Sequence, residues 1–198
     1  MKKFSLIILI FFLTIKISFA NTYNADPKIF VTELVNDAIS KLSDKNISKE
    51  EKALFIEKIA IENVDIDALG LYTLGELRKT SNEDALKKYK KSFEKYFLKS
   101  LTSRLTDYSS NKFEVISAEK KSSNYTIVKS KIVGDNQPEI KINWRIFTKN
   151  SEKPLIRDLI VEGLSLARTQ KEEFASILNS NNNDINKLIE ELEKFLKN

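Results

Sequence analysis

The sequence predicts an α+β protein in which helices wrap a four-stranded antiparallel sheet. Apolar residues recur at helical spacing through the first half of the chain, and apolar and polar residues alternate between about residues 112 and 162. In the stretch 158–166, an apolar run ends, Glu162 and Gly163 follow, and an amphipathic segment continues to Leu178. Glycine adopts backbone angles that other residues avoid, so this stretch is expected to pass from the last strand into a helix.

The N-terminal residues 1–20 have the pattern of a secretory signal peptide. A pair of lysines precedes an unbroken apolar run over residues 6–13, and Ser18-Phe19-Ala20 places small side chains where a signal peptidase reads the chain. The apolar run is short for a bilayer span, which disfavours an uncleaved membrane anchor. We therefore expect export, cleavage before Asn21, and a single folded domain over residues 21–198.

Composition excludes several functional classes. Cleavage lowers the formal net charge from +5 to +2, because Lys2, Lys3 and Lys16 leave with the signal peptide, and the remaining lysines are interspersed with acids. This pattern disfavours nucleic-acid binding. The chain has no cysteine and no histidine, which excludes disulfides, Ser-His-Asp and Cys-His catalysis and the usual zinc sites. We predict no catalytic residue, no metal ligand and no cofactor.

The first half of the mature chain, about residues 26–108, has recognisable helix starts. Asp26-Pro27 is a cap followed by proline at the first helical position, and residues 48–51 form a capping box. Asp65 and Asp67 precede a short apolar segment. Two carboxylates without further ligands make a weak cation site, so we interpret them as a helix cap and an acid that matches the helix dipole.

The longest predicted helix opens at residues 81–84 and carries an unusually aromatic stripe. Lysines cover much of the opposite side of this helix. A stripe of this kind packs into a core or lines a ligand cavity, and periodicity does not separate the two. The stripe consists of Leu86, Tyr89, Phe93, Phe97, Leu101 and Leu105.

Strand patterns follow the long helix, and closing helices are expected over about residues 165–197. Ile142, Trp144 and Ile146 alternate with polar residues and so share one face of a strand. Short turns between the strands favour an antiparallel meander over about residues 112–162. The predicted strands cover residues 113–118, 125–133, 139–148 and 155–161.

The segment Gly163-Leu164-Ser165 partly matches the nucleophile elbow of serine hydrolases. That motif needs a second glycine two residues after the serine, where this chain has Ala167, and no histidine is present to act as the base. The sequence therefore argues against a hydrolase. Glu162 is open to two interpretations, a functional residue or a cap of the turn that follows it, and we favour the cap.

Several short motifs resemble the MlaC family, also called toluene-tolerance proteins. The order of signal peptide, helical half, four-stranded sheet and closing helices also matches over essentially the whole mature chain. Glu76-Leu77 stands where the family often has an aromatic pair, and Ser81 where it often has a proline, so local loop details differ. The similarity is carried by Leu74-Gly75, Arg78, Phe93 and Leu98, and by Glu162-Gly163-Leu164-Ser165-Leu166, Thr169-Gln170 and Phe174.

The resemblance implies a periplasmic phospholipid-binding protein of a Gram-negative bacterium, with a fold related to the nuclear-transport-factor and cystatin-like folds. It implies a carrier of lipids between an outer-membrane Mla-type lipoprotein complex and an inner-membrane Mla-type ABC transporter complex, which maintains outer-membrane lipid asymmetry. We expect a monomer, with the phospholipid as cargo rather than as a cofactor. The acyl chains are expected in a cavity between sheet and helices, with the headgroup near solvent.

The apolar faces of the long helix and of the sheet supply the expected lining of this cavity. Each buried CH₂ group contributes about 0.8 kcal/mol, so two acyl chains contribute on the order of 20 kcal/mol before costs. Such affinity slows spontaneous release, so handover should need a partner. The expected lining residues are Leu74, Phe93, Phe97, Leu101, Leu105, Ile142, Trp144, Ile146, Leu159, Val161, Leu166 and Phe174.

The sequence leaves other functions open. A carrier of hopanoids or other lipids from the same family would use the same cavity. A periplasmic chaperone would bind apolar peptides on the same surface. An enzyme would need a polar catalytic cluster inside the pocket, and a purely structural envelope protein would have no cavity.

Overall fold

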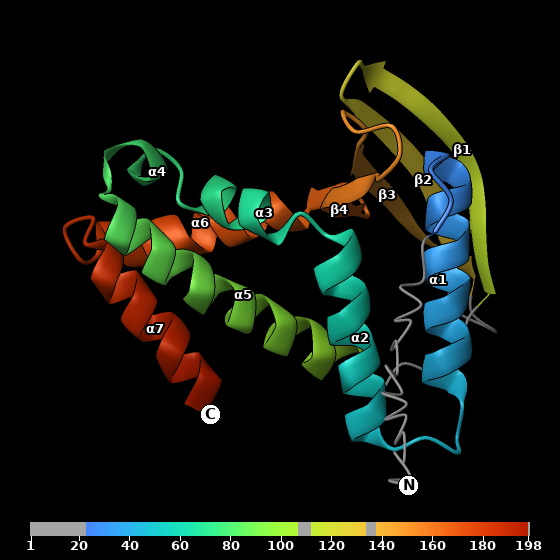
Figure 1. The fold of residues 1–198 in the computed structure, drawn as a ribbon, viewed down its shortest axis with the longest axis horizontal. Helices are drawn as coiled ribbons and strands as arrows, with labels where there is room; N and C mark the ends of the chain where they lie inside the picture. Colours follow the sequence, from blue (N-terminus) through green and yellow to red (C-terminus); the bar gives the residue numbers. More distant parts are fainter. Residues whose placement is uncertain (1–22, 107–111, 134–137, 198) are drawn as a thin grey trace, which may run out of the picture.

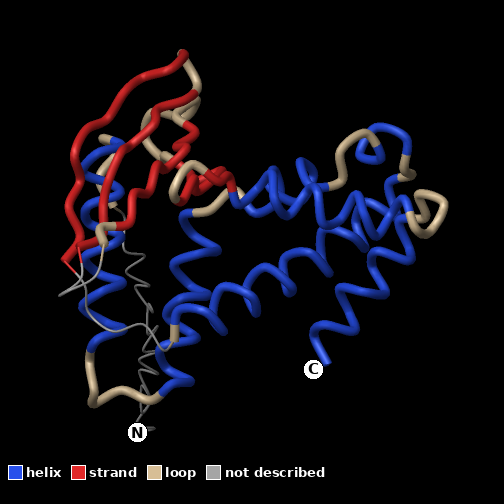
Figure 2. The backbone as a smooth tube through the Cα atoms, turned by 180° about the vertical axis from the view of Figure 1, so that it is seen from behind, coloured by secondary structure: helices blue, strands red, loops and turns tan. Residues whose placement is uncertain are grey.

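A computed structural model of the chain describes residues 23–106, 112–133 and 138–197. A sheet lies at one end of the molecule and most of the helices lie at the other (Figure 1, Figure 2). No helix within those three ranges is long and apolar enough to cross a bilayer. The predicted signal peptide, its cleavage site and most of the turn after residue 133 lie outside the described residues.

Three helices begin where the sequence predicts caps. The Asp26 carboxylate accepts hydrogen bonds from two backbone N–H groups of the first turn. Ser48 and Glu51 form the predicted capping box, and Asp65 accepts from the backbone N–H of Ala68. The helices are α1 (Pro27–Ser43), α2 (Lys49–Asn63), α3 (Ile66–Thr73), α4 (Leu77–Thr80), α5 (Glu83–Leu105), α6 (Leu166–Asn179) and α7 (Ile185–Lys197).

The sheet is an antiparallel meander in the order β1-β2-β3-β4-β5, one strand more than predicted. The additional strand arises because Glu162 and Gly163 both adopt left-handed backbone angles, with φ 48° and 84°. This makes a two-residue turn, which returns Leu164 to pair with Val161. The strands are β1 (Lys112–Ser122), β2 (Tyr125–Val133), β3 (Ile140–Phe147), β4 (Leu155–Val161) and β5 (Leu164–Ser165).

A first hydrophobic core, the helical core, forms among α3, α5, α6 and α7, with one residue from α2. Phe93 lies near its middle and Gly70 of α3 lies against it, because a Cβ at Gly70 would lie 2.8 Å from Phe93 Cδ1. The absence of a side chain at Gly70 therefore allows α3 and α5 to approach closely. The helical core consists of Ala60, Ile66, Leu74, Tyr89, Phe93, Leu98, Phe174, Leu178, Ile185, Leu188, Ile189 and Leu192.

A second core, the sheet core, lies between α1 and one face of the sheet. Figure 1 shows α1 lying across the sheet, at the opposite end of the molecule from α4 and α7. Alternation along the strands buries one face of each and leaves charged residues on the other. The sheet core consists of Phe30, Val31, Leu34, Val128, Trp144, Ile146 and Ile156.

The two cores meet where α2 passes into α3 beside β4. Val64 packs against both cores and pairs with Ile156 as a parallel bridge. The Asp65 carboxylate accepts hydrogen bonds from Arg157, with Nε 2.8 Å and Nη2 2.6 Å from Oδ2. The guanidinium also lies 3.5 Å from the centre of the Phe147 ring. This Asp65–Arg157 junction therefore ties the start of α3 to the sheet.

Replacing Arg157 by alanine should lower the free energy of unfolding by about 2–3 kcal/mol, because charge-assisted hydrogen bonds to Asp65 and to the Tyr125 hydroxyl are lost. The Asp65 and Arg157 side chains are 18% and 26% exposed, so solvent screens part of the loss. Urea unfolding measures the change.

Arg145→Ala is the matched control for this variant. The Arg145 guanidinium lies 3.9 Å from Asp158 and its side chain is 45% exposed, so its loss should cost less than about 1 kcal/mol. Equal losses in the two variants would show that the Asp65–Arg157 junction contributes no more than a surface ion pair.

Candidate functional site

The predicted lining residues on α5 differ in their environment along the helix. Phe93 is buried in the helical core, where it stacks on Tyr89 and meets the edge of Phe174 at 6.2 Å between ring centres. Phe97 and Leu101 are half-buried at the margin of the same core. Leu105 is also half-buried, close to the end of the helix.

The predicted lining residues on the sheet divide in the same way. Trp144 and Ile146 are buried in the sheet core. The indole N–H of Trp144 donates to Ser130 Oγ at 2.9 Å, and that hydroxyl donates to the carbonyl of Ile142 at 3.0 Å, so the polar groups beside the core are paired. Ile142 and Leu159 are half-buried and pack against this core.

The predicted lining set is thus divided between two cores rather than brought around one space. The stripe of α5 is covered by α2, α3, α6 and α7, and the inner face of the sheet is covered by α1. Leu74 and Phe174 belong to the helical core, whereas Val161 is half-buried and Leu166 is 44% exposed. Their contact with a lipid stays a prediction.

The half-buried members of the set have a property that the buried ones lack. A side chain enclosed on all sides contacts only its own core, whereas a half-buried apolar side chain keeps surface for another apolar molecule. We name this subset the marginal residues. They are Phe97, Leu101, Leu105, Ile142, Leu159 and Val161.

Tyr89 shows how polar atoms inside the helical core are satisfied. Its hydroxyl lies 2.7 Å from Thr73 Oγ1, which donates to the Gly70 carbonyl at 2.7 Å. Burial raises the pKa of the Tyr89 phenol well above its usual range, although the Thr73 hydroxyl opposes the shift. Tyr89 therefore stays neutral at physiological pH and serves packing rather than proton transfer.

The stretch from β4 to α6 is organised by Asp158, whose role was not predicted. Its carboxylate is buried, accepting from Ser165 Oγ at 2.6 Å and from the backbone N–H of Ala167 at 3.0 Å. The expectation that Glu162 caps the following turn is wrong. Its carboxylate accepts from the backbone N–H of Lys141 on the neighbouring strand, and its own backbone N–H donates to the Lys141 carbonyl at 3.0 Å.

Replacing Asp158 by alanine should lower the free energy of unfolding by about 1–3 kcal/mol, since it leaves a buried backbone N–H of α6 without an acceptor. Thermal and urea unfolding measure the loss. Glu172→Ala, an exposed change on the same helix, should stay within about 0.5 kcal/mol of the wild type. A stable Asp158→Ala variant would show that the cap is dispensable.

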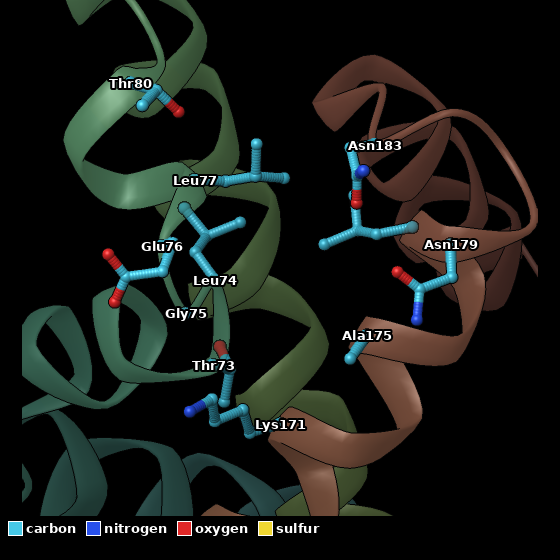
Figure 3. A pocket seen from close by; sticks show the side chains of 11 residues that line it. Thr73, Leu74, Gly75, Glu76, Leu77, Thr80, Lys171, Ala175, Asn179 and Asn183 are labelled. Atoms are coloured by element: carbon cyan, nitrogen blue, oxygen red, sulfur yellow. The ribbon is translucent and has the colours of Figure 1, made fainter.

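Two surface hollows of about 410 Å³ each lie between α6 and the segment from α3 to α4. Of the predicted lining residues, only Leu74 lines either of them. The sequence predicts that one face of α6 is exposed, because its polar residues recur at helical spacing. The sequence does not indicate that α3 and α4 lie beside that face, so these hollows were not predicted. The first hollow, shown in Figure 3, is lined by Thr73, Leu74, Gly75, Glu76, Leu77, Thr80, Lys171, Ala175, Leu178, Asn179 and Asn183. The second hollow is lined by Tyr72, Arg168, Lys171, Glu172 and Ala175.

Comparison with known proteins places the chain in a family. The chain is similar in fold to a solved structure of the phospholipid-binding protein from Ralstonia solanacearum in complex with a phospholipid, with a TM-score of 0.71 and 13% sequence identity. The match covers 88% of this chain and 97% of that one. No curated protein matches the chain. The family model described as MlaC protein matches residues 32–194, so the chain belongs to the MlaC family.

Proposed function

We propose that this protein binds a phospholipid and carries it through the periplasm. The observation that carries the proposal is the shared fold with a protein solved in complex with a phospholipid, over 88% of this chain. Membership of the MlaC family supports binding and transport rather than catalysis. A carrier needs apolar surface and no acid–base pair, which agrees with a chain that has no histidine and no cysteine.

The marginal residues are the proposed contacts for the acyl chains. Phe97 and Leu101 present apolar surface at the edge of the helical core, and Ile142 and Leu159 present it at the edge of the sheet core. Acyl chains lying against both edges would remove this surface from water, at about 25 cal/mol per Å². The buried members of the predicted set would support this lining from behind.

The carrier would exchange lipid with two membrane complexes. Two buried acyl chains contribute on the order of 20 kcal/mol before costs, which makes unaided release slow. We therefore propose that an inner-membrane Mla-type ABC transporter complex and an outer-membrane Mla-type lipoprotein complex accept or supply the lipid. This cycle would maintain lipid asymmetry of the outer membrane, with the protein exported by its signal peptide and acting as a monomer.

Identification of the bound molecule tests the proposal. The exported protein is purified without detergent, and native mass spectrometry and lipid extraction identify what it carries. We expect phospholipid at about one molecule per chain. Recovery of a hopanoid would favour a hopanoid carrier of the same family, and recovery of peptide alone would favour the periplasmic chaperone. Protein that carries nothing and takes no phospholipid from vesicles would refute the carrier.

Export has its own test. N-terminal sequencing of the periplasmic protein should begin at Asn21, because Ser18-Phe19-Ala20 forms the expected cleavage site. Recovery of the intact Met1 terminus, or of the protein embedded in membranes, would contradict the assignment.

A further inference from the structure

The two hollows beside α6 adjoin and form one groove, which we name the α6 groove. Both are lined by Lys171 and Ala175, so the second hollow continues the first along the helix. From Arg168 to Asn179 the groove follows about 17 Å of α6, at 1.5 Å per residue. It runs along α6 from near β5 toward the α4 end of the molecule (Figure 1).

The floor of the groove is apolar and firmly held. Leu74 and Leu178 are each 3% exposed and belong to the helical core, so their positions are fixed by packing below the groove. Ala175, one turn before Leu178 on α6, adds a small side chain, which leaves depth for a larger apolar group from outside. A floor of this kind is preformed rather than created on binding.

Two cations, Arg168 and Lys171, line the groove. Among the described residues, no hydrogen bond or ion pair joins the side chains of Arg168 or Lys171 to an acid. The stem of Lys171 lies 3.4 Å from where a Cβ of Gly75 would be, and its ammonium lies 5.3 Å from the centre of the Tyr72 ring. These contacts hold the charge over the groove.

The acids nearby do not cancel this charge. Glu76 is paired with Lys79 at 2.8 Å, and Lys79 lowers the pKa of its carboxyl through a hydrogen bond and charge attraction, with smaller contributions from Arg78 and Lys171. Glu172 is the one other acid that lines the described groove, whereas four cations lie in or beside it: Arg168 and Lys171 in the lining, and Arg78 and Lys79 next to Glu76. The groove therefore favours a ligand that brings carboxylates.

The polar groups are spread along the groove instead of converging on one point. Side-chain amides of Asn179 and Asn183 stand at one end, with no hydrogen bond to other described residues, and Arg168 stands at the other end. Asn183 is fixed by a left-handed backbone and by its N–H, which donates to the Leu178 carbonyl at 2.8 Å. Small-molecule pockets are more enclosed and gather their polar groups.

We propose that the α6 groove docks an acidic peptide segment of a protein partner. One large apolar side chain of the segment would occupy the hollow over Ala175, its carboxylates would meet Lys171 and Arg168, and its backbone would bond the two asparagine amides. Exposed Tyr72 and Arg168 belong to the residue types that dominate binding energy at protein interfaces. None of the marginal residues lines the groove, which would let a partner hold the carrier while its lipid is exchanged.

A peptide library tests this docking site directly. Random 12-residue peptides displayed on phage are selected on the immobilised full-length mature protein, and selected peptides are synthesised and measured by fluorescence anisotropy. We expect selection of leucine, isoleucine or phenylalanine beside aspartate or glutamate. Because the buried area is small, dissociation constants should be on the order of 1–100 µM.

Three variants test whether peptide binding depends on the groove or only on the overall charge of the protein. Ala175→Trp fills the hollow and Lys171→Glu reverses its charge, so each should weaken binding at least about tenfold. Lys95→Glu makes the same charge change on an exposed face of α5 that has no ion pair among the described residues, and should change binding less than about twofold. Ala175→Trp should also keep its bound phospholipid, which separates this test from that of the carrier.

Several outcomes would overturn the proposal. One is selection that enriches no acidic, apolar sequences. Another is selected peptides that bind Ala175→Trp and Lys171→Glu as they bind the wild type, or that lose binding equally with Lys95→Glu. Displacement of the peptides by short-chain phosphatidylglycerol below its micellar concentration would assign the groove to an amphiphile instead.

Discussion

Leu101→Trp should abolish recovery of bound phospholipid while the protein stays folded. Leu101 is half-buried at the margin of the helical core, so added volume there projects into the space proposed for the acyl chains and spares the packed interior. Bound phospholipid per folded protein is the measurement, with circular dichroism as the test of folding. We expect a loss of most of the lipid, because a rigid indole displaces methylene groups that each contribute about 0.8 kcal/mol.

Ile116→Trp is the control for Leu101→Trp. Ile116 is 55% exposed on β1 and lies outside the proposed lining, so the same bulky residue there should leave the lipid load unchanged. The assignment of the marginal residues fails if Leu101→Trp and a second variant, Ile142→Trp, retain full lipid loads or both unfold.

Phe93→Ala should cost about 3–5 kcal/mol of unfolding free energy, the largest stability loss expected for a single change in this chain. Phe93 is 2% exposed, packs against Gly70 and contacts several other aromatic rings, so its loss leaves a cavity that rigid helices cannot close. Urea unfolding of the lipid-free protein measures it.

Leu101→Ala provides the comparison for Phe93→Ala. It should cost less than about 2 kcal/mol in the lipid-free protein, because a half-buried side chain already has solvent on one side. If Phe93→Ala were nearly neutral in stability but emptied the protein of lipid, Phe93 would line the lipid site directly rather than support it from the core.

Local signals in the sequence predicted the elements well because they act between neighbouring residues. Asp26, Ser48 and Asp65 cap helices through side-chain hydrogen bonds to the next turn, and the strand register of β2 and β3 follows from alternation. The same locality explains the missed fifth strand. A two-residue strand carries almost no pattern of its own and depends on the backbone angles of Glu162 and Gly163.

Periodicity in the sequence does not determine which apolar faces pack against each other. The stripe containing Phe93 and the strand face containing Trp144 are both apolar, and each was expected to meet the other. In the structure, α2, α3, α6 and α7 cover the first and α1 covers the second. Apolar surfaces attract without direction, so the sequence shows which faces are buried but not against which partner.

The two-core arrangement has a consequence for the order in which the chain is made. The sheet core needs Ile156, and the helical core needs Leu188 and Leu192, so neither is complete until late in translation. A nascent chain that ends at Leu105 has the stripe of α5 without α6 and α7, and has α1 without its sheet. For the export proposed above, this delay keeps most of the polypeptide unfolded for a translocation channel. Before the later segments are made, α1 lacks its sheet, and α2, α3 and α5 bury only part of their apolar faces against one another.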